Sequence, residues 1–182
     1  MYTDNNNEKQ SMDKMEKNKE PQDYELQING LINAVIELLK VKVIDSHCYR
    51  NLIDNIAAYY TGSVNKTKKW DTKKLKEHCC WTDAAKNTKV MEKEHVIPMS
   101  QIITILLALD DLSPSSVKKC IQKYAVYCMV TKEEHSLLNT KYQSKMPAGF
   151  WTKGDELYDE PFARYIALDI KVDYDFRYIK AK

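Results

Sequence analysis

The spacing of apolar residues predicts two helices near the start of the ordered chain. Between residues 26 and 39 apolar side chains recur every three or four positions, which is typical of an amphipathic helix with a broad buried face. Asp45 or Ser46 can cap a second helix with a similar apolar stripe, and Gly62 is placed to end it. The short link between the two predicts an antiparallel helical hairpin over residues 23–62.

Two more helices are predicted in the middle of the chain. Residues 99–109 contain the longest apolar run, which is long enough for a buried helix but too short to span a bilayer. Ser113 followed by Pro114 is typical of an N-cap and a first-turn proline, so another helix is expected from there to about Tyr124.

The clearest strand signal covers residues 125–131, which are rich in β-branched and aromatic side chains. Thr131 and Glu134 have the spacing of a capping box, which predicts that a helix starts directly after this strand. That helix would carry His135 and Asn139.

The end of the chain predicts a helix over residues 161–170 and, from an apolar–polar alternation, a strand over residues 172–178. The whole pattern indicates an α+β, mainly helical domain over residues 23–182, in which residues 146–182 form a C-terminal extension. Residues 1–22 contain no Leu, Ile, Val, Phe or Trp, so they cannot bury enough apolar surface to fold and are expected to be a disordered tail.

Composition narrows the class of protein without assigning a function. The net charge of +2 does not indicate a nucleic-acid binder, so any basic surface must come from local clustering. No signal peptide or membrane span is recognisable. The five cysteines include no Cys-x-x-Cys pair, which favours free thiols in a reducing compartment, either the cytoplasm or the host cytoplasm of a phage protein.

Four polar side chains have the spacing of a hydrolytic metal site. His135 and Asn139 are four residues apart on a predicted helix, so they project from the same face and can share one cation. Glu94 is the natural carboxylate to complete a mixed nitrogen and oxygen ligand set, which suits Mg²⁺ or Mn²⁺ first and Zn²⁺ or Ni²⁺ as alternatives. His95 points differently and stays free to activate water, as phosphodiester hydrolysis requires.

Two segments resemble the halves of a nuclease motif. Residues 94–100, Glu-His-Val-Ile-Pro-Met-Ser, resemble the first half of the HNH (ββα-metal) endonuclease motif. Residues 130–139, Val-Thr-Lys-Glu-Glu-His-Ser-Leu-Leu-Asn, are similar to its second half in the colicin-type nucleases, with Asn in place of the last His. The resemblance covers roughly residues 90–145 and implies a β-hairpin followed by a helix, wrapped around one metal ion.

Carried over to this chain, the resemblance implies that His95 is the general base and that three side chains hold the metal ion: Glu94, His135 and Asn139. The chain departs from the family in two places. The 39 residues between His95 and His135 imply a helical insertion in the hairpin. Val126 stands about where the family has an Asn that orients the base, so Tyr124 or a backbone carbonyl is expected to take over that task.

Basic side chains offer candidate contacts to nucleic acid. A lysine-rich segment interrupted by an aromatic can hold phosphates and stack a base, although such a run is usually a solvated helix face; its residues are Lys66, Lys68, Lys69, Trp70, Lys73, Lys74 and Lys76. Arg164 can contact a phosphate through its fork of donors, or it can line the core. Arg50 and Lys141 are weaker candidates of the same kind.

The leading hypothesis is a metal-dependent HNH-type endonuclease that acts on DNA rather than RNA, and a homodimer is considered. The alternative is a catalytically inactive HNH-like factor of the phage or mobile-element type, which binds nucleic acid or a protein through its first helices. A third interpretation is a helical module stabilised by zinc, although buried free thiols are the preferred view of the residues involved: His78, Cys79, Cys80, Cys120 and Cys128.

Overall fold

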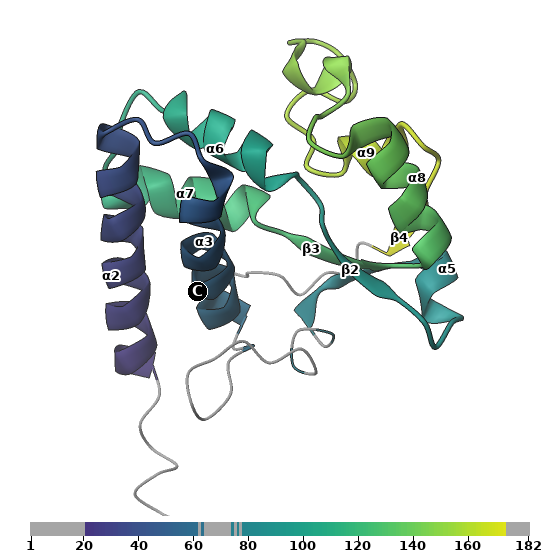
Figure 1. The fold of residues 1–182 in the computed structure, drawn as a ribbon, viewed down its shortest axis with the longest axis horizontal. Helices are drawn as coiled ribbons and strands as arrows, with labels where there is room; N and C mark the ends of the chain where they lie inside the picture. Colours follow the sequence, from purple (N-terminus) through teal and green to yellow (C-terminus); the bar gives the residue numbers. More distant parts are fainter. Residues whose placement is uncertain (1–20, 62, 64–73, 75, 77, 174–182) are drawn as a thin grey trace, which may run out of the picture.

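The computed structural model describes residues 21–61, 63, 74, 76 and 78–173. Its described part is mainly helical, with one small four-stranded sheet, which confirms the predicted α+β class (Figure 1). None of the described helices is both long enough and apolar enough to cross a membrane.

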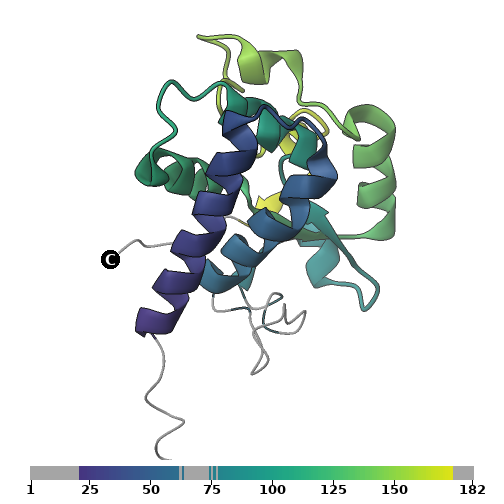
Figure 2. The same ribbon diagram turned by 60° about the vertical axis from the view of Figure 1, so that its left-hand side comes forward.

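The predicted helical hairpin is present. Helix α2 (Pro21–Lys40) and helix α3 (Ser46–Thr61) run antiparallel and side by side (Figures 1 and 2). The carboxylate of Asp45 accepts the backbone N–H of His47 at 2.9 Å, so Asp45 caps α3 as one of the two predicted alternatives. Helix α2 includes Pro21 and the next residue, which the sequence assigned to the tail, whereas residues 1–20 and Gly62 lie outside the described residues.

The sheet consists of four short strands in the order β2–β3–β1–β4. Strands β2 (Glu92–His95) and β3 (Tyr127–Val130) are antiparallel, with His95 opposite Tyr127. Strand β1 (Cys80–Thr82) runs parallel to β3, and β4 (Val172–Asp173) runs antiparallel to β1. The sequence predicted β3 and the position of β4, but it did not predict β1.

The connection from β2 to β3 contains the two helices expected there. These are α6 (Met99–Leu107) and α7 (Pro114–Tyr124), and Ser113 caps α7 by accepting the backbone N–H of Ser116 at 3.3 Å. Helix α8 (Lys132–Tyr142) follows β3 directly. Both hydrogen bonds of the predicted capping box between Thr131 and Glu134 are formed, at 3.1 and 2.8 Å.

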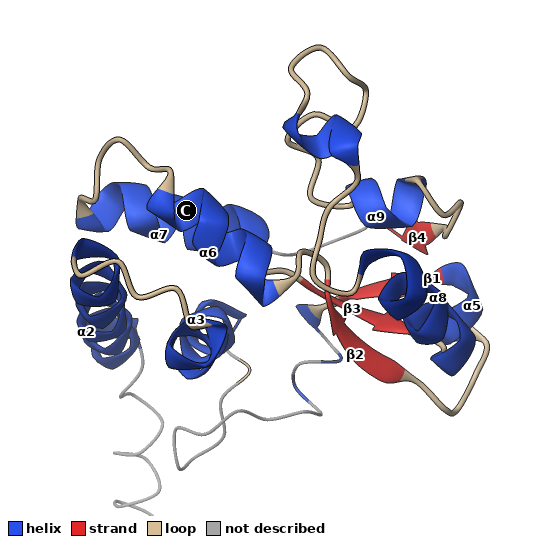
Figure 3. Ribbon diagram, turned by 45° about the horizontal axis from the view of Figure 1, so that its top comes forward, coloured by secondary structure: helices blue, strands red, loops and turns tan. Residues whose placement is uncertain are grey.

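Helices cover both faces of the sheet (Figure 3). Alternate residues of β3 take part in different cores: Tyr127 and Met129 pack with α2, α3, α6 and α7, whereas Cys128 and Val130 pack with α8 and the C-terminal segment. The short helix α5 (Asp83–Lys86) follows β1. Because successive strand residues face opposite sides, the adjacent Glu94 and His95 on β2 point towards different layers.

The C-terminal extension contains less regular structure than the sequence predicted. It forms the 3₁₀ turn η1 (Ala148–Trp151) and the short helix α9 (Ala163–Ile166), in place of a helix over residues 161–170. The backbone N–H of Ile170 bonds back to the carbonyl of Tyr165 at 2.9 Å and Asp169 has a left-handed φ of 53°, so the helix is closed early. Of the predicted strand over residues 172–178, two residues form β4, and the rest lies outside the described residues.

Candidate active site

Glu94 links strand β2 to helices α8 and α9. Its Oε1 accepts a hydrogen bond from Nη2 of Arg164 at 2.9 Å, and its Oε2 lies 3.3 Å from Nε2 of His135. The Glu94 side chain is only 13% exposed. One carboxylate oxygen is therefore held by the buried guanidinium, while the other faces the imidazole that was predicted to be its fellow ligand.

His135 and Asn139 share one face of α8, as their spacing predicts. Nδ2 of Asn139 lies 3.2 Å from Nε2 of His135. A half-turn of the side-chain amide exchanges its nitrogen and oxygen. In that orientation the amide oxygen and Oε2 of Glu94 both lie near Nε2 of His135, so the structure brings all three predicted metal ligands together.

One distance at the site is compatible with two ligands of a single divalent cation. The 3.3 Å between Oε2 of Glu94 and Nε2 of His135 is the separation expected of two ligands that each lie about 2.1 Å from one ion at a near-tetrahedral angle. Across the described ranges, no group of three or more His, Cys, Asp or Glu side chains is placed to hold a metal ion. The candidate centre thus consists of Glu94 and His135 with an amide as third protein ligand.

His95 is held by a residue that the sequence did not reveal. Nε2 of His95 lies 3.1 Å from Oδ1 of Asp54 on helix α3. The same oxygen accepts the hydroxyl of Tyr127, whose ring lies 4.7 Å from the His95 ring, centroid to centroid. Of the two expected orienting groups, Tyr124 instead donates to Asp159, and the partner of Nε2 is the Asp54 carboxylate rather than a backbone carbonyl.

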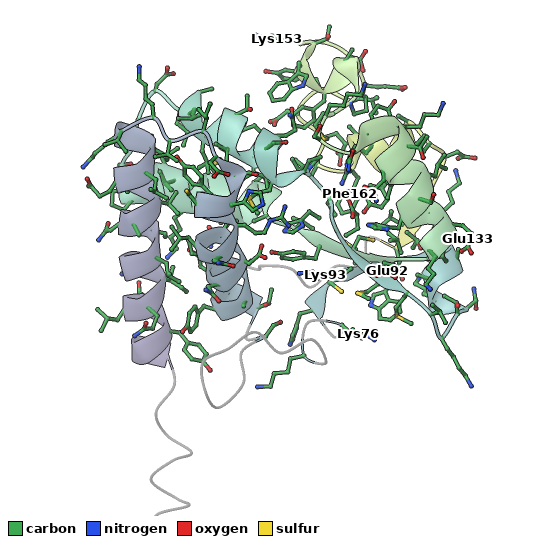
Figure 4. The ribbon with its side chains drawn as sticks, viewed as in Figure 1. Lys76, Glu92, Lys93, Glu133, Lys153 and Phe162 are labelled. Atoms are coloured by element: carbon green, nitrogen blue, oxygen red, sulfur yellow. The ribbon has the colours of Figure 1, made fainter. Side chains whose placement is uncertain are left out.

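The charge on Asp54 fixes the role of each His95 nitrogen. Burial raises the pKa of Asp54, but the hydrogen bond and the charge of His95 outweigh it, together with the Tyr127 hydrogen bond and the charge of Lys93, and lower the pKa overall. Lys93 lies between the sheet and α3 (Figure 4). A carboxylate can only accept, so Nε2 of neutral His95 carries the proton, and Nδ1 is the basic nitrogen.

Arg164 is placed in the interior rather than on the surface. Its side chain is 0% exposed, and it donates to Glu94 and to three backbone carbonyls, those of His95, Val96 and Tyr142. The structure therefore corrects its proposed contact with nucleic acid: the guanidinium fixes Glu94 and the turn after β2, and no donor reaches the surface.

A polar cleft of about 320 Å³ opens at this site. It is bounded by the start of α3, the end of β2, the start of α6 and the end of α8; its lining residues are Ser46, Arg50, Glu94, His95, Pro98, Met99, Ser100, Asn139, Gln143 and Ser144. The candidate base and two candidate ligands thus share one solvent-accessible hollow, which can admit a small charged group of a larger substrate.

No protein-family model, curated protein or solved structure matches this chain.

Most of the predicted lysine-rich segment lies outside the described residues; this applies to Lys66, Lys68, Lys69, Trp70 and Lys73. Lys74 and Lys76 are described and exposed, and so is Lys141 on α8. All five cysteines are free thiols, as predicted, and every one except Cys48 is buried.

One signal could have revealed Asp54 in the sequence. It lies beside Ile53 and two residues before Ile56, within the apolar stripe of α3, and its side chain is 21% exposed. A carboxylate at the edge of a buried helix face needs a partner, because burial without one is costly. The sequence shows that need, but it does not show that the partner is His95.

Proposed function

We propose that this protein is a divalent-metal-dependent endonuclease of the HNH type that hydrolyses phosphodiester bonds, with DNA as the favoured substrate. The observation that carries this proposal is one cleft lined by a carboxylate-oriented imidazole, His95, and by a candidate ligand, Glu94, whose Oε2 lies 3.3 Å from Nε2 of His135. A base and a cation site side by side are the two elements that metal-assisted hydrolysis of a phosphodiester requires.

The local topology supports the same proposal. Strands β2 and β3 are antiparallel neighbours, and α8 follows β3 directly through a capped turn. Glu94 and His95 stand at the end of the first strand, and His135 and Asn139 stand on the helix. This is the order and placement that the HNH resemblance implies, with α6 and α7 inserted between the two strands.

The residues divide the chemistry between them. Nδ1 of His95 takes a proton from water, whose oxygen forms the new bond to phosphorus while the bond from phosphorus to one ester oxygen breaks. That oxygen leaves with the electron pair and gains a proton from solvent. Asp54 holds the imidazole and balances its positive charge after the transfer. A divalent cation bound by Glu94, His135 and Asn139 would neutralise phosphate charge and stabilise the leaving oxygen.

The test is cleavage of supercoiled plasmid and of a labelled RNA with Mg²⁺, Mn²⁺, Zn²⁺ or Ni²⁺, by the wild type and by His95→Ala. His47→Ala is the matched control, because His47 is a highly exposed histidine on the same helix as Asp54. We expect nicking of DNA by the wild type and the control, and a loss of about 100-fold or more in His95→Ala. Binding without cutting under every ion would instead favour the inactive binding factor.

A further inference from the structure

Helix α3 contributes an arginine, Arg50, to the wall of the cleft. Ser46, Arg50 and Asp54 follow one another at intervals of four residues, so they form a stripe on one face of α3. Ser46 and Arg50 line the cleft, and Asp54 at the other end of the stripe contacts His95. Arg50 is therefore one helical turn from the residue that holds the candidate base.

The charge of Arg50 is not used within the described part of the protein. Its side chain is exposed, and none of the ion pairs or side-chain hydrogen bonds found among the described residues involves it. The nearby carboxylates have other partners, since Arg164 and His135 contact Glu94, whereas His95 and Tyr127 contact Asp54. Lys93 lies close enough to Arg50 to feel its charge. Burial is the largest effect and lowers the pKa of Lys93, the charge of Asp54 raises it, and the charge of Arg50 lowers it further.

Residue 50 is an arginine in a chain whose basic residues are mostly lysines. The chain contains three arginines against 25 lysines, and two of the three, Arg50 and Arg164, lie beside Glu94 and His95. Arginine differs from lysine in its rigid, planar fork of donors, which matches two oxygens of a carboxylate or phosphate at once. Arg164 uses its fork on protein oxygens, whereas Arg50 lines the cleft and is exposed.

We propose that Arg50 binds the non-bridging oxygens of the substrate phosphodiester, which is thereby held between α3 and α8. This inference rests on the proposed function, and it makes the N-terminal helical hairpin a wall of the active site. A polyanion with phosphate diester groups is the ligand class that this cleft would take.

The test measures binding of a fluorescent duplex oligonucleotide of about 20 base pairs to the full chain carrying His95→Ala, with and without Arg50→Ala. We expect roughly a tenfold or greater increase in Kd, as for loss of a charged hydrogen-bonding group. The slope of log affinity against log salt should also weaken by about 0.9, corresponding to one lost phosphate contact. Arg50→Lys should retain the slope but recover only part of the affinity, because lysine keeps the charge and loses the fork.

Lys119→Ala is the matched control, because Lys119 is an exposed cation on α7 that does not line the cleft. Equal changes in Kd for Arg50→Ala and Lys119→Ala would overturn the inference, and so would the absence of oligonucleotide binding by the parent protein. If Arg50→Ala has lost its helical circular-dichroism signal, Arg50→Lys alone decides, and an affinity of this variant equal to that of the parent would contradict the predicted role of the fork.

The two proposals can fail separately. If the wild type never cuts but binding depends on Arg50, the phosphate site stands and the nuclease function fails. If the wild type cuts and Arg50→Ala changes neither KM nor kcat, the nuclease function stands and the role of Arg50 fails.

Discussion

Oδ1 of Asp54 lies 3.1 Å from Nε2 of His95, although the two residues are 41 positions apart in the sequence. This pair joins helix α3 to the end of strand β2, and the hydroxyl of Tyr127 reinforces it from β3. The contact gives the candidate base a fixed orientation and a defined tautomer. It also means that the helical hairpin is part of the site rather than an addition to it.

Asp54→Asn should reduce nuclease activity while the overall structure is retained. An amide can donate as well as accept, so it no longer enforces the proton on Nε2 or balances the charge that His95 gains. We expect kcat to fall by about 100-fold, with a smaller change in KM, measured on a fluorogenic DNA substrate.

Asp110→Asn is the control for this comparison, because Asp110 is an exposed aspartate outside the cleft. Tyr127→Phe removes only the second hydrogen bond to Asp54 and should have an intermediate effect. An Asp54→Asn protein as active as Asp110→Asn would show that Asp54 does not position the base.

Asp54 should also make stability depend on pH at the acidic end. Its pKa in the folded protein is lower than the value of about 3.9 in an unfolded chain, so the carboxylate form favours folding. This contribution is fully present above the unfolded pKa and is lost as pH falls through the folded pKa. The free energy of unfolding, from urea titrations between about pH 6 and pH 2.5, should therefore fall more steeply for the wild type than for Asp54→Asn. Parallel curves would contradict this role.

Local patterns predicted those parts of the fold that local physics decides. The helical periodicity, the Ser113 cap and the capping box at Thr131 each depend on neighbours within four residues, and the structure contains all of them. The composition of β3 predicted this strand, because a strand that is buried on both faces consists almost entirely of apolar residues. Spacing on one helix also placed His135 beside Asn139.

The remainder depends on contacts between distant segments. Asp54 reaches His95 only because α3 packs beside the sheet, which no local spacing encodes. Strand β1 has three residues and acquires its identity by pairing with β3. Arg164 has the same sequence signature whether it contacts phosphate or protein, and its burial is decided by how the C-terminal segment folds over Glu94.

Removal of Arg164 should destabilise the protein strongly. Arg164→Met leaves the largely buried carboxylate of Glu94 without its guanidinium and frees three backbone carbonyls. We expect a loss of about 3–5 kcal/mol in the free energy of unfolding from urea denaturation.

A second substitution tests whether the unpaired charge on Glu94 causes the loss of stability in Arg164→Met. Arg164→Met combined with Glu94→Gln should be more stable than Arg164→Met alone, because the unpaired charge is then absent. A cost below about 1 kcal/mol for Arg164→Met would be typical of a surface ion pair and would refute its buried role.

The cysteines should differ sharply in reactivity. Cys48 is exposed, whereas burial raises the pKa of Cys79 and of Cys120 to about 12, and Cys80 and Cys128 are also buried. A thiol-specific reagent at neutral pH should therefore modify one thiol of the native protein rapidly and all five after unfolding. The exchange Cys48→Ser should abolish the rapid phase, and rapid modification that persists in this variant would contradict the assignment.

The most direct test of the central claim is the initial rate of DNA cleavage as a function of divalent-ion concentration, after the protein has been stripped with EDTA. The wild type should show no cleavage without added ion and a saturable rise with Mg²⁺ or Mn²⁺. His135→Ala should require a higher ion concentration, by about tenfold or more, whereas His95→Ala should lose maximal rate with an unchanged midpoint. A wild-type rate that is independent of added ion, or equal to that of both variants, would contradict the account.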